Sequence, residues 1–103
     1  MLTTQNLTKD HLDLMQAIQQ NNNISQRQIS QQTGLSIGKI NYCLKALIDI
    51  GCIKIVNFNN SSQKLNYTYI LTPKGIRQKT EIIKKFITFH KQEYDKLNSY
   101  IIK

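Results

Sequence analysis

The segment from Arg27 to Leu47 constrains the fold more than any other stretch, because its residues form the pattern of two short helices joined by a tight turn. Gly34 can adopt a positive φ at the turn without a Cβ penalty, and Ser36 can cap the helix that follows. Beyond the turn, apolar residues recur at helical spacing and are expected to face the core: Ile40, Cys43, Leu44 and Leu47. The second helix of such a helix-turn-helix can enter the DNA major groove, so the segment indicates sequence-specific DNA binding rather than catalysis.

One further helix is expected before the helix-turn-helix. Thr8 can serve as the N-cap of this first helix, which should end at the run Asn21–Asn23, and Ile24 is a candidate for a very short strand. The second helix should span 26–32 with Ser25 as its cap, and the third should run from Ser36 to about residue 50. Leu35 is expected to plug the core between them.

A β-hairpin should follow the third helix. The segments Cys52–Phe58 and Leu65–Leu71 are rich in β-branched and aromatic residues and flank a polar turn cluster, which together predict two antiparallel strands. A hairpin at this place is the wing of a winged helix. Thr72 and Pro73 then suit the start of a long helix running to about Ile101, roughly 40 Å in length.

The long helix carries two apolar rows. One row alternates spacings of four and three, as in a heptad seam, and contains Ile76, Thr80, Ile83, Ile87, His90, Tyr94, Leu97 and Ile101. The other contains Ile82, Phe86 and Phe89. One row can pack on the domain and the other on a second copy of the chain. We therefore expect a homodimer whose contacts come from Ile76, Ile83, Phe86, Ile87, His90, Tyr94, Leu97 and Ile101.

Length and charge fit this interpretation. The chain of 103 residues predicts one domain, with a winged-helix core at 8–72 and a C-terminal helix at 73–103. The predicted fold class is mainly α with a small β-hairpin.

The net charge of +8 favours a polyanionic partner, although solubility alone is the plainer explanation. Residues 72–103 hold eight of the 14 basic residues, so the last third is the most basic part.

The same sequence argues against other classes of protein. The first ten residues lack the pattern of a secretory signal, and no apolar run is long enough to span a bilayer, so we expect a cytoplasmic protein without a membrane partner. Cys43 and Cys52 do not have zinc-site spacing and are expected to be free thiols; control by their oxidation stays open. His11 and His90 lie on separate predicted helices. We therefore expect no enzyme, no metal and no cofactor.

The outward face of the third helix supplies the candidate DNA contacts. Asn41 can pair with adenine N6 and N7, Tyr42 can meet a phosphate or a thymine methyl, and Lys39 and Lys45 suit phosphates. Ile37 is either a core plug or a thymine-methyl contact, and the core is favoured. The full set of predicted contact residues is Ser25, Gln26, Gln28, Ser36, Gly38, Lys39, Asn41, Tyr42, Lys45, Lys54, Asn59, Asn60, Lys64 and Lys74.

Two stretches carry a family resemblance: ISQRQISQQTGLSIGKINYCLKALIDIGCIK at 24–54 and YILTPKGIRQK at 69–79. They resemble the MarR family of bacterial transcriptional regulators. The short length and the segment NYCLKALI at 41–48 resemble a small subgroup named for association with extracellular-polysaccharide gene clusters. The resemblance implies a homodimer that binds a pseudo-palindromic site on double-stranded DNA, as a repressor. Typical members have further N- and C-terminal helices and often bind a small effector, which leaves an effector open here. The alternative is a winged helix that binds protein or RNA.

Overall fold

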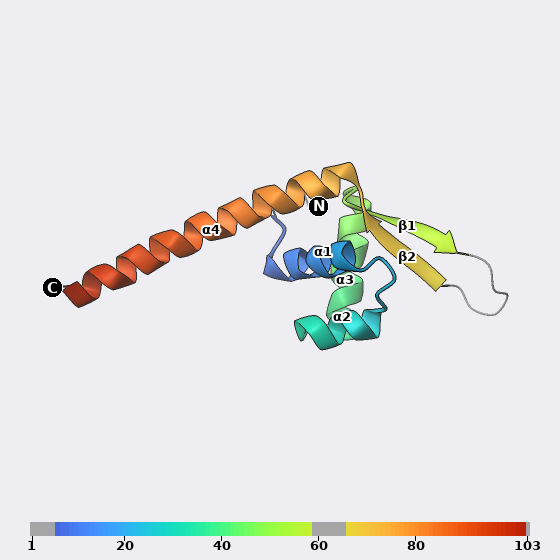
Figure 1. The fold of residues 1–103 in the computed structure, drawn as a ribbon, viewed down its shortest axis with the longest axis horizontal. Coiled ribbons are helices and arrows are strands. Elements are labelled where there is room, and N and C mark those ends of the chain that lie inside the picture. Colours follow the sequence, from blue (N-terminus) through green and yellow to red (C-terminus); the bar gives the residue numbers. More distant parts are fainter. Residues whose placement is uncertain (1–5, 59–65, 103) are drawn as a thin grey trace.

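The computed structural model describes residues 6–58 and 66–102 and contains, in this part of the chain, four helices and one two-stranded sheet (Figure 1). The elements follow the expected order, and the arrangement is a winged helix-turn-helix with a long C-terminal helix. Their bounds are α1 (Lys9–Gln20), α2 (Gln26–Thr33), α3 (Ile37–Asp49), β1 (Ile53–Phe58), β2 (Asn66–Leu71) and α4 (Pro73–Ile102). The hairpin turn lies outside the described residues.

The core forms where α1, α2 and α3 meet the base of the hairpin. Leu14, Met15 and Ile18 of α1 are fully buried, as is Ile29 of α2. The prediction for α3 is confirmed, because the helix buries one complete face consisting of Ile40, Cys43, Leu44 and Leu47. Because this face is buried, the rotation of α3 about its own axis is fixed, and so is the set of side chains that it exposes to solvent.

Two expectations for single residues were wrong. Ile24 is buried but belongs to no strand, because Asn21 Oδ1 accepts the Asn23 N–H and bends the chain, so that the Ile24 N–H bonds to the Asn21 carbonyl instead of a neighbouring strand. Ile37 is 44% exposed rather than a core plug. Leu35, two residues earlier, takes the inward place and packs against the core.

The two strands pair antiparallel, from Ile53 opposite Leu71 to Phe58 opposite Asn66. The hairpin leads directly into α4, and the junction is tied back to the end of α3. The Thr72 N–H donates to the Cys52 carbonyl at 3.0 Å, and Thr72 Oγ1 accepts the Gly75 N–H at 3.0 Å. The long helix therefore starts from a hydrogen-bonded anchor beside the C-terminal end of α3.

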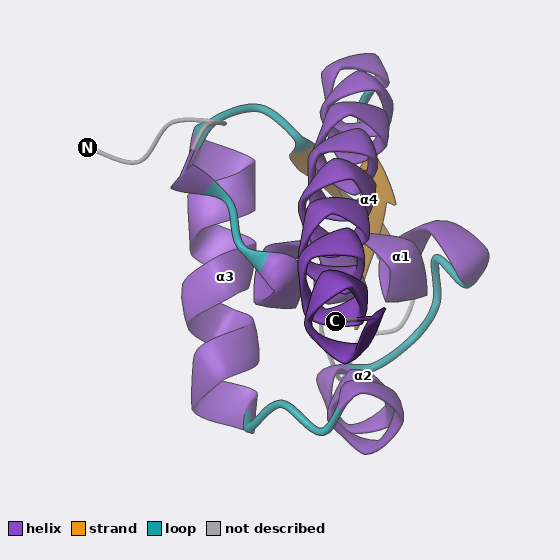
Figure 2. Ribbon diagram, turned by 90° about the vertical axis from the view of Figure 1, so that its left-hand side faces the viewer, coloured by secondary structure: helices purple, strands orange, loops and turns teal. Residues whose placement is uncertain are grey.

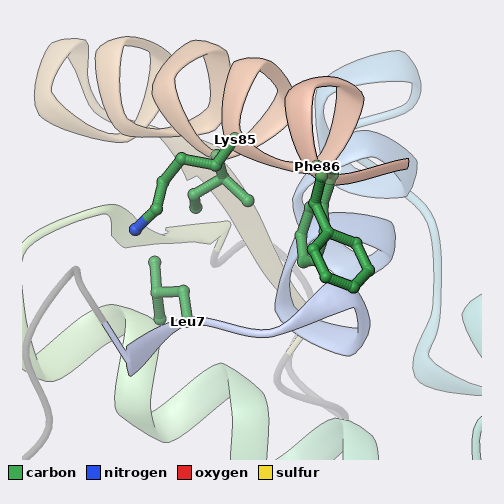
Figure 3. A pocket seen from close by; sticks show the side chains of 5 residues that line it. Leu7, Lys85 and Phe86 are labelled. Atoms are coloured by element: carbon green, nitrogen blue, oxygen red, sulfur yellow. The ribbon is translucent and has the colours of Figure 1, made fainter. Parts of the chain in front are cut away.

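The molecule measures 67 × 26 × 24 Å, and helix α4 projects far beyond the rest of it (Figure 1). Near its start, Ile82 is buried in the core and Phe86 packs against it. A cavity of about 330 Å³ lies between α4 and the segment before α1 and is lined by Leu7, Ile82, Lys85, Phe86 and Phe89 (Figure 3). None of the helices in the described part of the chain has the length and apolar character needed to cross a membrane.

Candidate nucleic-acid interface

The face of α3 opposite the core is open to solvent. Figure 2 shows α3 beside the other helices, with α2 joined to its N-terminal end by a short loop. The predicted contact residues of this face are all exposed: Ser36, Gly38, Lys39, Asn41, Tyr42 and Lys45. We call these six residues the α3 face. It combines two amines, an amide and a phenol, which suit phosphate oxygens and base edges.

The turn between α2 and α3 is held by local hydrogen bonds. Gly34 has a φ of +80°, the left-handed conformation that glycine adopts without strain. Ser30 Oγ donates to the Leu35 carbonyl at 2.6 Å, and Ser36 Oγ accepts the Lys39 N–H at 3.1 Å. These bonds fix the direction in which α3 leaves the turn, and therefore the orientation of the α3 face.

Ser25 and Gln28 form a reciprocal cap at the start of α2. Ser25 Oγ accepts the Gln28 N–H at 3.1 Å, and Gln28 Oε1 accepts the Ser25 N–H at 2.9 Å. Both side chains are exposed, so the predicted phosphate contacts stay predictions, but their oxygens already stabilise the helix end. The prediction of Ser25 as the helix cap is confirmed, whereas the role of Gln28, which completes the S-x-x-Q pattern of a capping box, was overlooked in the sequence.

The Lys39 ammonium lies near two other side chains of its own chain. Its Nζ lies 3.6 Å from an Asp10 carboxylate oxygen of α1 and 6.0 Å from the ring centroid of Tyr42. Lys45 and Lys54 are exposed and form no ion pair with any described residue. The ammonium groups of Lys45 and Lys54 are thus open to a polyanion, whereas that of Lys39 is shared with Asp10.

Asn41 has a partner that the sequence did not indicate. Gln26 Nε2 donates to Asn41 Oδ1 at 3.1 Å, across the gap between α2 and α3. Gln26 was expected to contact phosphate, but its amide nitrogen is turned toward the α3 face. The two residues are 15 positions apart, and only the crossing of the two helices brings them together.

Of the predicted DNA contacts near the hairpin, Lys74 lies in the described part of the chain, whereas those of the hairpin turn do not. Lys74 Nζ donates to the Ile50 carbonyl at 2.8 Å, so this ammonium caps the C-terminal end of α3 instead of pointing freely outward. Asn59, Asn60 and Lys64 lie outside the described residues, as do Ser62 and Gln63. The wing contribution stays a prediction.

The two cysteines are free and buried. Burial raises the pKa of the Cys43 thiol, and likewise that of Cys52, which disfavours the thiolate that oxidation chemistry requires. In the described part of the chain, no group of three or more His, Cys, Asp or Glu side chains is arranged to hold a metal ion.

The predicted dimer contacts of α4 divide between two environments. Phe86 is half-buried against the core of its own chain and belongs with Ile82 to the intramolecular row, and Ile83 is also half-buried. The other predicted residues are exposed: Ile76, Ile87, His90, Tyr94, Leu97 and Ile101. Phe89 and Tyr100, outside the predicted set, are also exposed.

Comparisons with known proteins agree with this geometry. A family model for winged helix-turn-helix DNA-binding domains matches residues 9–54, the region from α1 to the first residues of β1. A search of curated proteins found no match.

Solved structures share the fold. FabT of Streptococcus pneumoniae in complex with DNA is similar with a TM-score of 0.58 and 19% identity, over 91% of this chain and 62% of that one. MarR of Staphylococcus aureus in complex with salicylate and kanamycin has a TM-score of 0.64 and 20% identity, over 89% and 60%. The MarR repressor of Listeria monocytogenes has a TM-score of 0.56 and 19% identity, over 93% and 72%. The chain spans about three fifths of the length of the first two structures.

Proposed function

We propose that this chain is a sequence-specific DNA-binding transcriptional regulator of the MarR type. The observation that carries the proposal is the division of α3 into a completely buried face and an open one. Ile40 and Leu47 are fully buried, while Lys39, Asn41 and Lys45 are exposed on the other side. A helix anchored in this way presents its polar side chains at a constant angle to a duplex.

The charge and the neighbouring structures support the same function. The chain carries a net charge of +8, which attracts a phosphate backbone. The FabT structure that shares the fold contains DNA. A regulator of this kind acts in the cytoplasm of a bacterium, where its DNA target lies.

The proposal includes a homodimer formed through α4. Beyond Phe86 the helix exposes Ile87, Tyr94, Leu97 and Ile101, and an isolated helix of this kind gains stability by burying its apolar row against a second copy. Two α3 helices would then sit about one helical turn of DNA apart on a pseudo-palindromic site. Repression follows if that site overlaps a promoter and blocks polymerase.

The test is selection of duplexes from a random library, followed by anisotropy titration of the selected site and a scrambled duplex. The wild-type chain is expected to enrich one sequence. Lys39→Ala with Asn41→Ala should weaken binding to that sequence by about tenfold or more, since a phosphate contact and a base contact are lost together. The matched control is Lys96→Ala with Asn98→Ala, which alters the same residue types on the exposed part of α4 and should leave affinity unchanged.

An absence of enrichment, with equal affinity for every duplex, would contradict the proposal and favour a protein-binding or RNA-binding winged helix. Selection from genomic fragments extends the test to biological role. Enrichment of sequences upstream of polysaccharide genes would support the resemblance to the short MarR subgroup.

A further inference from the structure

The contact between Gln26 and Asn41 joins the first residue of α2 to the α3 face. Gln26 Nε2 donates to Asn41 Oδ1 at 3.1 Å. Gln26 is half-buried and Asn41 is exposed, so the bond lies at the surface, within the area that a duplex would cover. We call this pair the amide clasp.

Both ends of the amide clasp are held by rigid backbone. The reciprocal cap of Ser25 and Gln28 fixes the start of α2, where Gln26 lies. The cap by Ser36 and the burial of Ile40 fix α3 around Asn41. The separation of the two backbone positions is therefore set by the fold, and it lets the side chains form their hydrogen bond within the free chain.

A surface bond of this kind contributes little to stability, because water competes for the same donor and acceptor. Its consequence is orientation. A side-chain amide presents a carbonyl oxygen on one side and an NH₂ group on the other, and rotation about its last bond exchanges them. Donation from Gln26 holds Oδ1 of Asn41 on the side of α2, which leaves Nδ2 directed away from Gln26.

This orientation matches a purine edge. Adenine offers N7 as an acceptor and N6–H₂ as a donor in the major groove, and an asparagine amide satisfies both. Nδ2 of Asn41 can donate to N7, and the second lone pair of Oδ1 can accept from N6. We infer that Gln26 is a positioning residue that orients the Asn41 amide to read adenine. This inference rests on the proposed DNA-binding function.

The role of Gln26 in the amide clasp differs from the phosphate contact that its position first suggests. One of the two N–H donors of its side-chain amide is committed to Asn41. A positioning residue lowers the entropy lost when Asn41 docks on a base. Its removal should therefore change base preference, whereas loss of a phosphate contact would weaken binding to all sequences.

The first experiment uses the free protein. In Gln26→Ala, the side-chain NH₂ resonances of Asn41 should shift in a ¹⁵N–¹H spectrum, because Oδ1 loses its donor. Gln31→Ala is the matched control, since Gln31 is the same residue type, exposed, and on the same helix. Unchanged Asn41 resonances in Gln26→Ala would show that the clasp does not form in solution and would overturn the inference.

The second experiment measures affinity for the sequence selected by the wild-type chain, for single base-pair variants of it, and for scrambled duplex. Gln26→Ala should weaken binding to the selected site about five- to tenfold, by reducing discrimination at one A·T pair. Affinity for scrambled DNA and the salt dependence should not change. In a chain that already carries Asn41→Ala, the Gln26 substitution should have no further effect.

Two results would overturn the inference while leaving the proposed function in place. The first is equal weakening on selected and scrambled DNA with a smaller salt dependence, which identifies a phosphate contact. The second is that Gln26→Ala discriminates between the selected site and each of its base-pair variants as strongly as the wild-type chain does. A wild-type chain that enriches no sequence would refute both the proposed function and the inference, and would be recognised before any variant is compared.

Discussion

The Lys39 ammonium of α3 lies 3.6 Å from the Asp10 carboxylate of α1, with both side chains partly open to solvent. An exposed ion pair of this kind contributes only about 0.2–1 kcal/mol. In the proposed complex, Asp10 would compete with a phosphate for the same ammonium, and this competition would lower the affinity for DNA by a free energy of similar size.

The first prediction concerns this competition. Asp10→Asn should raise affinity for duplex DNA about two- to fivefold and steepen its salt dependence by about one counterion. Anisotropy titrations over a range of salt concentrations measure both quantities. Asp13→Asn is the control, because Asp13 pairs with Lys9 of the same helix, at 3.3 Å, and its loss changes the net charge equally. Equal effects of the two variants would show that only net charge matters.

The second prediction concerns Gly38, whose added Cβ would meet no atom within 4 Å. Gly38→Ala should stabilise the free protein by about 0.5–1 kcal/mol, since alanine is the better helix former. It should at the same time weaken DNA binding if the backbone approaches the duplex there. Urea unfolding and anisotropy separate the two effects. A variant that is more stable and binds as tightly as the wild type would place Gly38 outside the interface.

The third prediction concerns Gly75, at the junction of the hairpin and α4. A Cβ at this position would overlap the Cys52 carbonyl, and both residues belong to hydrogen-bonded backbone that cannot easily move apart. Gly75→Ala should therefore destabilise the protein by about 1–3 kcal/mol, opposite in sign to Gly38→Ala. The measurement is again the urea unfolding midpoint, and an unchanged midpoint would mean that the junction is looser than the structure shows.

The fourth prediction concerns pH. His11 is buried, and its Nδ1 accepts the Thr8 N–H at 3.0 Å, which requires the neutral ring. Burial is the main cause that lowers the pKa of His11 below its ordinary 6.5; Asp10 opposes the shift and Lys39 adds to it. Well above pH 6.5, His11 is neutral in both the folded and the unfolded chain. Below pH 6.5 the unfolded chain binds the proton first, so stability should decline as pH falls.

Urea unfolding at pH 7.5, 6.5 and 5.5 checks this expectation. His11→Gln should be less stable at pH 7.5 but should lose less stability on acidification than the wild type does. His90→Gln removes a histidine that is exposed on α4 and should retain the wild-type decline. If the free energy of unfolding falls with pH by the same amount in all three proteins, other groups cause the acid sensitivity.

The helices and strands could be predicted because each is indicated by residues close together in the sequence. Several contacts of the candidate interface could not be predicted, because they join residues far apart in the sequence. The spacing of Ile40 and Leu47 by itself determines which face of α3 is buried. The environment of Ile37 depends on competition with Leu35 for one inward position, and helical periodicity cannot decide between two residues that flank a turn. The bond from Lys74 to the Ile50 carbonyl and the amide clasp each arise from the packing of separate elements.

The last prediction concerns the outer half of α4, where Leu97 is 58% exposed in the single chain. In the proposed dimer this side chain is buried, which contributes about 1–2 kcal/mol per copy. Twofold symmetry places the substitution in both copies, so its effect is doubled. Leu97→Asp should therefore convert a dimer into a monomer at micromolar concentration, as measured by light scattering. Gln92→Asp adds the same charge to an exposed position outside the heptad row and should leave the dimer intact. On DNA, Leu97→Asp should lose the palindromic site while retaining weak half-site binding, because the α3 face lies in a separate part of the fold. A wild-type chain that is monomeric at this concentration, or a Leu97→Asp variant with the mass of a dimer, would show that α4 does not form the proposed interface.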